Sequence, residues 1–270
     1  MIMNRLTMLA VTLMASMACF AQGKMATTIE SGKQVGDVFD YLELKYKVTN
    51  ASAGYTVQVI GFADAFEADP TKFDTSEDID AFNTVTIPHY IGTSTDVAVQ
   101  VYVQSIADGA LNTSDATLAG KVTAITIQYV DNDKTQGIPV SIGENAFAGL
   151  TSVTTVESFI PGAKVAAIPA TSFATSVYKT ATLKTPEKVM GKYTSKEGWK
   201  RFLKITDGSI LLGDIDGNGS INALDVAKFN KAYKTGVWTG LNKDAVDMNS
   251  DGTIAAVEYA QFCKRYKEFY

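Results

Sequence analysis

Two twelve-residue segments in the C-terminal quarter of the chain carry oxygen-bearing side chains at the same spacing. The first segment is 214–225 and the second is 247–258. Positions one, three and five of each segment hold Asp or Asn, position six holds Gly and position twelve holds an acid. Ca²⁺ is a hard cation that binds six to eight oxygen atoms, so this arrangement of short oxygen-bearing side chains is typical of a calcium loop.

Each position of such a loop has a chemical reason. Position six must turn sharply, and Gly tolerates a left-handed backbone there. Position seven offers a backbone carbonyl, and the acid at position twelve can bind the ion through both oxygens from the first turn of a helix. Two matching loops predict two calcium ions. The predicted ligands are Asp214, Asp216, Asn218, Ser220 and Asp225 for one ion, and Asp247, Asn249, Asp251, Thr253 and Glu258 for the other.

The two predicted sites differ in chemistry. The first ends in Asp225, whose side chain is one methylene shorter than Glu. The second ends in Glu258 but has Ala255 at position nine, where we expect water to complete the coordination. Position eight is Ile221 in one loop and Ile254 in the other, and we expect these residues to face each other in a short β contact.

A helix with one apolar stripe is predicted after each loop. The stripe residues are Val226, Phe229 and Tyr233 after the first loop, and Tyr259, Phe262, Cys263 and Tyr266 after the second. The helices should pack on each other, with Cys263 as a small apolar residue in the seam rather than a reactive thiol. Because a module of about 60 residues buries little area, metal binding should contribute to its folding.

This tandem of loop–helix units resembles a type I dockerin. The resemblance implies that calcium orders the module and that one or both helices dock onto a cohesin domain of another protein. Partner contacts in the family involve loop positions ten and eleven, which here are Ala223, Leu224, Ala256 and Val257. These residues are apolar where many dockerins are polar, and the linker around 235–243 is longer than in compact dockerins. The partner is therefore a protein, of which a cohesin domain is one candidate.

The N-terminal residues 1–21 are predicted to form a secretory signal peptide. Arg5 precedes an uncharged, mostly apolar run, and Ala21 offers a small residue for cleavage. The alternative is a bacterial lipoprotein with a lipid on Cys19. The apolar run is too short for a stable membrane span, so we expect a secreted or cell-surface protein with no transmembrane segment in the mature chain.

Strand-like alternation dominates the segment between 39 and 130. Apolar and polar residues alternate over 42–48, 55–59 and 97–103, with the valines of the last run on its buried face. A weak repeat begins within this segment. Its copies are 105–111, 141–147 and 167–173, and in each an Ile precedes a large apolar residue by five positions.

The segment 141–156 resembles a BspA-like leucine-rich repeat. The closing residues Tyr193, Gly198, Trp199, Phe202 and Ile205 resemble the terminal unit of that family. The resemblance implies a short, capped stack over 95–206, preceded by a β-rich lead-in over 22–94 and followed by the dockerin-like module over 207–270. The alternative is a β-sandwich. The predicted fold class is thus α+β, with a β-rich N-terminal region containing a short leucine-rich-repeat-like solenoid and a small all-α calcium-binding dockerin.

Charge and residue pattern argue against nucleic-acid binding and against catalysis. The net charge of −5 and the absence of a basic stripe argue against a nucleic-acid partner. The acidic segment 64–80 has no matching distant acid for glycosidase chemistry, and His89 has no partner set for a metal or a nucleophile, so we predict no enzyme. The leading hypothesis is a secreted interaction protein. The alternatives are an adhesin for host or matrix proteins and an accessory component of polysaccharide degradation.

Overall fold

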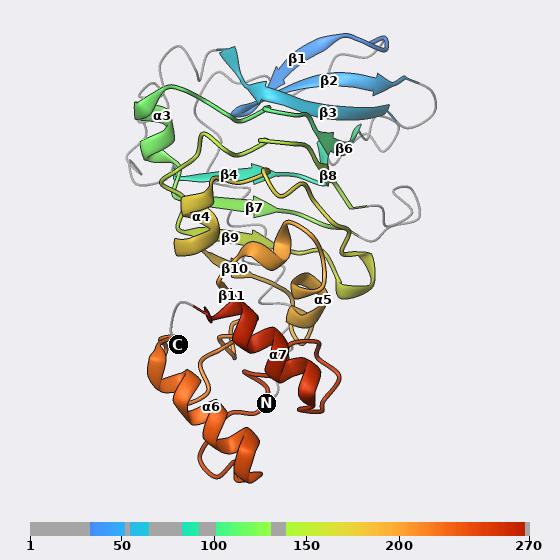
Figure 1. The fold of residues 1–270 in the computed structure, drawn as a ribbon. Helices are drawn as coiled ribbons and strands as arrows, with labels where there is room; N and C mark the ends of the chain where they lie inside the picture. Colours follow the sequence, from blue (N-terminus) through green and yellow to red (C-terminus); the bar gives the residue numbers. More distant parts are fainter. Residues whose placement is uncertain (1–32, 52–54, 65–82, 92–100, 131–138, 268–270) are drawn as a thin grey trace, which may run out of the picture.

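A computed structural model describes residues 33–51, 55–64, 83–91, 101–130 and 139–267. This part of the chain is mixed α and β, with mostly β-sheet and few helices (Figure 1). The predicted signal peptide, Cys19 and Ala21 lie outside the described residues. Among those that are described, no helix has the length and apolar character needed to cross a bilayer.

The first sheet has the order β1-β2-β3-β6-β5, with β8 paired to β6. Its strands are β1 Val38–Tyr41, β2 Leu44–Asn50, β3 Tyr55–Phe62, β5 Tyr90–Ile91, β6 Val101–Ile106 and β8 Ser141–Ile142. The predicted strand at 42–48 forms β2 two residues later, because Leu42 takes a left-handed φ of 52° in the turn from β1. Alternation then places Leu44, Tyr46 and Val48 inside, each 1% exposed.

The predicted strand at 97–103 corresponds in part to β6. Residues 97–100 lie outside the described part of the chain. Val101 and Val103 are buried as expected, but Tyr102 on the other face is also nearly buried, at 8% exposed. Gln104 is exposed, so the face that carries Tyr102 is covered only in part.

The second sheet is entirely parallel, with the order β4-β7-β9-β10-β11. Its strands are β4 Thr84–Ile87, β7 Ala124–Ile127, β9 Thr155–Ser158, β10 Thr182–Lys184 and β11 Lys204–Thr206. One residue of each strand stands at the same register position, and all five are 0% exposed. This buried ladder is Val85, Ile125, Val156, Leu183 and Ile205.

The three repeat copies lie beside one another in register. Ser105 pairs with Ser141 and Ile106 with Ile142 in the parallel β6–β8 contact. Phe147 of the second copy forms a parallel bridge with Phe173 of the third, and the two rings stack with centroids 4.8 Å apart. The large apolar residue of each copy, Leu111, Phe147 or Phe173, is buried.

Short helices and turns connect the parallel strands. They are α3 Ala116–Lys121, α4 Thr175–Thr180, α5 Met190–Thr194 and the 3₁₀ turns Gly162–Lys164 and Trp199–Arg201. Of the residues compared with a terminal unit, Tyr193, Trp199 and Phe202 are buried. The Trp199 indole donates a hydrogen bond to the Ala166 carbonyl at 3.0 Å, which joins this closing segment to the start of the third copy.

The C-terminal part of the chain contains α6 Ala223–Thr235 and α7 Ala256–Arg265. Both helices lie at the end of the molecule beyond β11 (Figure 1). We call residues 33–206 the β region and residues 207–267 the calcium module. The domain boundaries given above remain predictions.

Candidate calcium-binding site

The first loop is held at its end by the start of α6. The Asn222 side chain accepts a hydrogen bond from the Leu224 N–H at 2.8 Å and so caps the helix. Asp225 is 0% exposed in the first turn. Its carboxylate accepts from the Asn222 N–H at 2.9 Å and from the Ile215 N–H at 3.1 Å, so position twelve is fixed against both ends of the loop.

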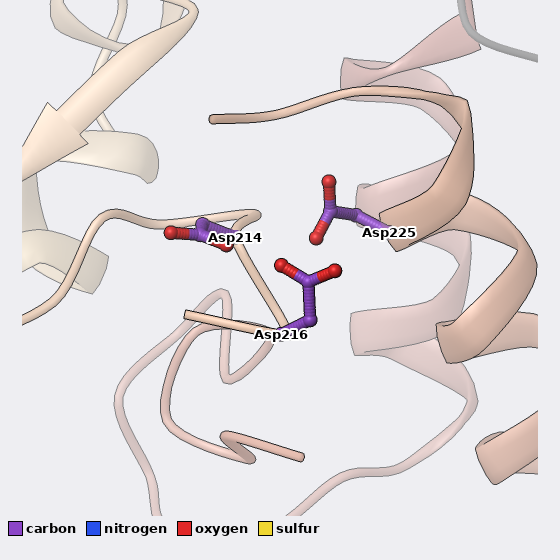
Figure 2. Close-up of side chains that lie close together, drawn as sticks. All are labelled: Asp214, Asp216 and Asp225. Atoms are coloured by element: carbon purple, nitrogen blue, oxygen red, sulfur yellow. The ribbon is translucent and has the colours of Figure 1, made fainter. Parts of the chain in front are cut away.

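Three carboxyl groups of the first loop come together. Asp214, Asp216 and Asp225 each place an oxygen within 4.8 Å of the others, with Asp225 on α6 and the other two on the preceding loop (Figure 2). Burial raises the pKa of Asp225, and the negative charges of Asp216 and Asp214 raise it further. A divalent cation would relieve this repulsion, so the donor set fits calcium.

Lys228 also takes part in the first site. Its ammonium lies 2.6 Å from Oδ2 of Asp216. This hydrogen bond holds the pKa of Asp216 below its usual range. The sequence analysis did not single out Lys228. Its place three residues after Asp225 puts it one helical turn above the loop, and that spacing is the signal that could have identified it.

The second loop has the same backbone arrangement as the first. Asp247 accepts a hydrogen bond from the Gly252 N–H at 2.7 Å, and Asp214 accepts one from the Gly219 N–H at 2.7 Å. Gly219 has a φ of 84° and Gly252 a φ of 83°. The left-handed turn predicted at position six is thus present in both loops.

Glu258 gives the second loop a buried oxygen without a protein partner. Its side chain is 0% exposed, and Oε2 accepts from the Ala255 N–H at 2.9 Å. Its Oε1 is buried and has no hydrogen-bond partner among the described residues. Because an unsatisfied buried carboxylate oxygen is costly, this atom fits a site for a cation.

The second loop does not gather its carboxylates as the first does. Within the described ranges, the acidic residues at positions one, five and twelve do not form a cluster comparable with that of the first loop. Asn249 instead donates to Asp251 at 2.8 Å. A hydrogen bond from the Thr253 hydroxyl is the main reason why the pKa of Asp251 is low.

The remaining predicted residues lie on the surface of the module. Asn218 accepts from the Ser220 N–H at 2.9 Å, a hydrogen bond within the loop. The four predicted partner contacts are all exposed, with Leu224 at 51% and Val257 at 49%. Those four residues are Ala223, Leu224, Ala256 and Val257.

The two helices share an aromatic seam, as predicted. Phe229 of α6 meets Phe262 of α7 with ring centroids 4.5 Å apart. Tyr233 and Tyr259 stack with centroids 4.5 Å apart and planes 14° apart. Cys263 lies beside this seam and is partly buried.

The expected β contact between the position-eight residues was wrong. Ile221 and Ile254 are both described and partly buried, but neither lies in a strand or bridge. Backbone hydrogen bonds near the start of each loop join the two halves instead. The Gly213 N–H donates to the Ala245 carbonyl at 2.6 Å, and the Asn242 N–H donates to that of Ile215 at 2.8 Å. The described backbone hydrogen bonds between the two halves thus lie near or before the start of each loop rather than at position eight.

His89 and Asp64, two polar residues considered in the sequence analysis, both have partners in the structure. His89 is 2% exposed, stacks on Tyr129 and accepts a hydrogen bond from the Val130 N–H at 2.6 Å. Asp64 forms an ion pair with Lys45, whereas 65–80 of the acidic segment lies outside the described residues. His89 therefore belongs to the packing of the β region.

Comparison with known families identifies one part of the chain. Residues 212–265 match the family model of the dockerin type I domain. Dockerin domains bind calcium, and a dockerin implies protein–protein attachment to a cohesin-type partner. Proteins with such domains are typically extracellular or associated with the cell surface. Searches of curated proteins and of solved structures find no match to the chain.

Proposed function

We propose that this chain is a secreted, non-catalytic interaction protein. Its dockerin binds two calcium ions and attaches the protein to a cohesin-type partner, while the β region displays a second binding surface. The observation that carries the proposal is the repeated loop geometry, in which the position-six Gly donates to the position-one Asp at 2.7 Å in both loops.

Calcium binding would shape the dockerin through residues at both ends of each loop. Bound calcium supplies two positive charges that neutralise clustered carboxylates. In the first loop Asp214 and Asp216 precede the turn and Asp225 begins α6, so ligation by all three fixes the direction of the helix relative to the loop. Glu258 has the same role at the start of α7, with its unpartnered Oε1 available to the second ion.

The exposed apolar residues at loop positions ten and eleven support protein docking. Leu224 and Val257 stand at equivalent places in the two units, immediately before the buried position-twelve acid. A fixed start to each helix would therefore hold these side chains outward in a defined geometry. A partner with an apolar patch of similar size would bury them, and burial of a Leu or Val side chain gives about 1.5–3 kcal/mol.

The β region supports the second part of the proposal. Its three repeat copies stack in register through the β6–β8 pair and the Phe147–Phe173 bridge. This arrangement supports a small BspA-like stack with a closing unit built around Trp199. An adhesin role for this surface, or an accessory role in polysaccharide degradation, would be a particular form of the same non-catalytic function.

Binding of the full mature chain to a panel of purified cohesin domains tests the docking function. We expect binding in calcium, and its loss in EGTA. The double variant L224S/V257S should weaken binding at least tenfold. V237S is the matched control, because Val237 is 60% exposed on the same module but outside the predicted contact positions. Equal retention of the partner in EGTA, or equal binding by the double variant, would contradict the proposal.

A further inference from the structure

The second calcium loop lies against the β region. Thr194 of α5 donates its hydroxyl to the Met248 carbonyl at 2.6 Å. The Gly191 N–H of α5 is bonded to the Ser250 hydroxyl oxygen at 3.0 Å. Met248 is only 2% exposed. Loop positions two to four thus form an interface with one face of α5, which we call the loop–α5 interface.

Gly191 allows the two backbones to approach closely. A Cβ at this position would lie 2.4 Å from the carbonyl carbon of Asn249 and 2.6 Å from its oxygen. A Cβ atom does not approach a non-bonded heavy atom this closely, and the obstacle is backbone rather than a flexible side chain. Gly191 lies within α5 and does not have a positive φ, so its role here is close approach rather than an unusual backbone conformation.

Position four distinguishes the two loops. Gly217 occupies it in the first loop with a φ of 71°, and Ser250 occupies it in the second with a φ of 58°. The left-handed conformation is costly for Ser, whereas Gly adopts it freely. In return, the Ser250 hydroxyl reaches the Gly191 N–H. The second loop has the side chain that the interface uses, at a place where the first loop has none.

Arg265 makes a second contact from the same loop–helix unit. It lies at the end of α7, and its guanidinium donates to the carbonyls of Lys200 at 3.0 Å and Phe202. These carbonyls belong to the closing segment of the β region. The second unit therefore contacts the β region through its loop and through the end of α7.

The interface residues alternate with the predicted calcium ligands. Met248 and Ser250 lie between Asp247, Asn249 and Asp251, which are positions one, three and five of the loop. Ordering of the ligands by an ion therefore also orders the face that contacts α5. Coupling of this kind is reciprocal, so the contact with α5 must favour ion binding as much as the ion favours the contact.

We propose that the second calcium loop is a calcium-dependent intramolecular docking site for α5. The contact raises the calcium affinity of this loop and fixes the dockerin on the β region. This inference rests on the proposed calcium ion at the second loop, but not on the identity of the external partner. The first loop has no part in it and serves as the internal reference.

Calcium titration of the ¹⁵N-labelled mature chain tests this coupling, with each loop followed separately. The Gly219 and Gly252 N–H groups each donate to the first Asp of their own loop, so their NMR signals report the two sites. In Gly191→Ala we expect the Gly252 midpoint to shift to at least tenfold higher calcium and the Gly219 midpoint to stay unchanged. Gly120→Ala is the control, because a Cβ there meets nothing within 4 Å.

A milder variant tests the same coupling if Gly191→Ala does not fold. Thr194→Val keeps the shape of the side chain but removes its hydrogen bond to Met248, and it should shift the Gly252 midpoint about fivefold, the size of one hydrogen bond. Thr194 also donates to the Gly191 carbonyl within its own helix at 3.0 Å, so its control is Thr180→Val on α4, where the hydroxyl donates to the Ser176 carbonyl at 3.0 Å.

The possible outcomes separate this inference from the proposed function. A wild-type chain whose Gly252 signal does not respond to calcium would contradict the proposed second ion. A Gly252 midpoint that is the same in wild type and in folded Gly191→Ala or Thr194→Val would contradict coupling between the interface and calcium binding. Equal shifts of Gly219 and Gly252 in Thr194→Val would also overturn it, because they would indicate a general loss of module stability.

Discussion

The two calcium loops share one backbone design but have different surroundings. Each loop turns at a left-handed Gly that donates to its first Asp at 2.7 Å. The first loop gathers three carboxylates and places Lys228 against one of them. The second has a buried Glu258 oxygen that finds no partner within the described part of the chain, and it packs on α5. The motif determines the backbone conformation of each loop, whereas the surrounding residues determine which other parts of the molecule the loop contacts.

Calcium removal gives the largest expected effect and tests whether both loops depend on the ion. A site that is saturated at 1,000 times its Kd stabilises the folded form by about 4 kcal/mol. We expect EGTA to remove hydrogen-exchange protection from α6 and α7 while β7, β9 and β10 stay protected. Equal protection of α6 and α7 with and without EGTA would contradict a calcium-folded module.

Removal of one position-twelve acid should weaken calcium binding at its own loop and leave the other loop unchanged. Asp225→Asn and Glu258→Gln each keep the side-chain shape but remove the charge that closes one site. Loss of supporting residues around a metal typically reduces affinity 10–100-fold, so loss of a direct ligand should reduce it by about 100-fold or more. Calorimetric titration should show one weakened site in each variant. A loss of both sites in either variant would mean that the loops fold as a unit.

A buried acid outside the loops provides a contrast in pH dependence. Glu43 is 4% exposed, and burial raises its pKa from 4.5 to about 7. The unfolded chain therefore loses this proton first, so stability falls as the pH rises from about 4.5 to about 7, by about 3 kcal/mol in all. Denaturation of the β region should show this fall, and Glu43→Gln should abolish it.

The calcium loops should have the opposite pH dependence, because their carboxylates must be deprotonated to bind the ion. Stability of the calcium module in saturating calcium should thus rise as the pH rises through the pKa values of these carboxyl groups. Separate probes, such as exchange of the α6 amides and of the β7 amides, distinguish the two trends. Parallel trends in the two regions would contradict this contrast.

The smallest expected effect concerns Lys228. Its positive charge lies beside a predicted ligand of the first ion, so Lys228→Met should increase the calcium affinity of the first loop by about three- to tenfold. The second loop should be unaffected. Lys231→Met is a control on the same helix. An unchanged first-site affinity would mean that Lys228 leaves Asp216 when the ion binds.

The sequence could predict the loops because their chemistry is local. Ligand spacing, the position-six Gly and the apolar stripes of α6 and α7 all lie within short segments. The packing of Phe229 on Phe262 and the two left-handed Gly turns follow from them. The strands of the first sheet could likewise be predicted from alternation, and the stacked copies from the spacing of Ile106 and Ile142.

Contacts between distant segments could not be predicted in this way. The roles of Gly191 and Ser250 depend on two backbones 59 positions apart in sequence. Nothing near Gly191 in the sequence indicates that a loop will cover it. The predicted Ile221–Ile254 β contact is absent from the described residues, and the hydrogen bonds of Gly213 and Asn242 join the two halves instead.

The junction between the β region and the calcium module determines how the protein bears mechanical load. Thr206 bridges to Leu211, and the Leu212 N–H donates to the Ile205 carbonyl at 2.8 Å. The Tyr266 hydroxyl, from the last helical turn, donates to the Leu212 carbonyl at 2.5 Å. The entry and exit of the module are thus fastened at one point. A pull applied through α6 would be borne by this junction together with the contacts of Arg265 and the loop–α5 interface, and would have to break them before the β-sheet is peeled from its end.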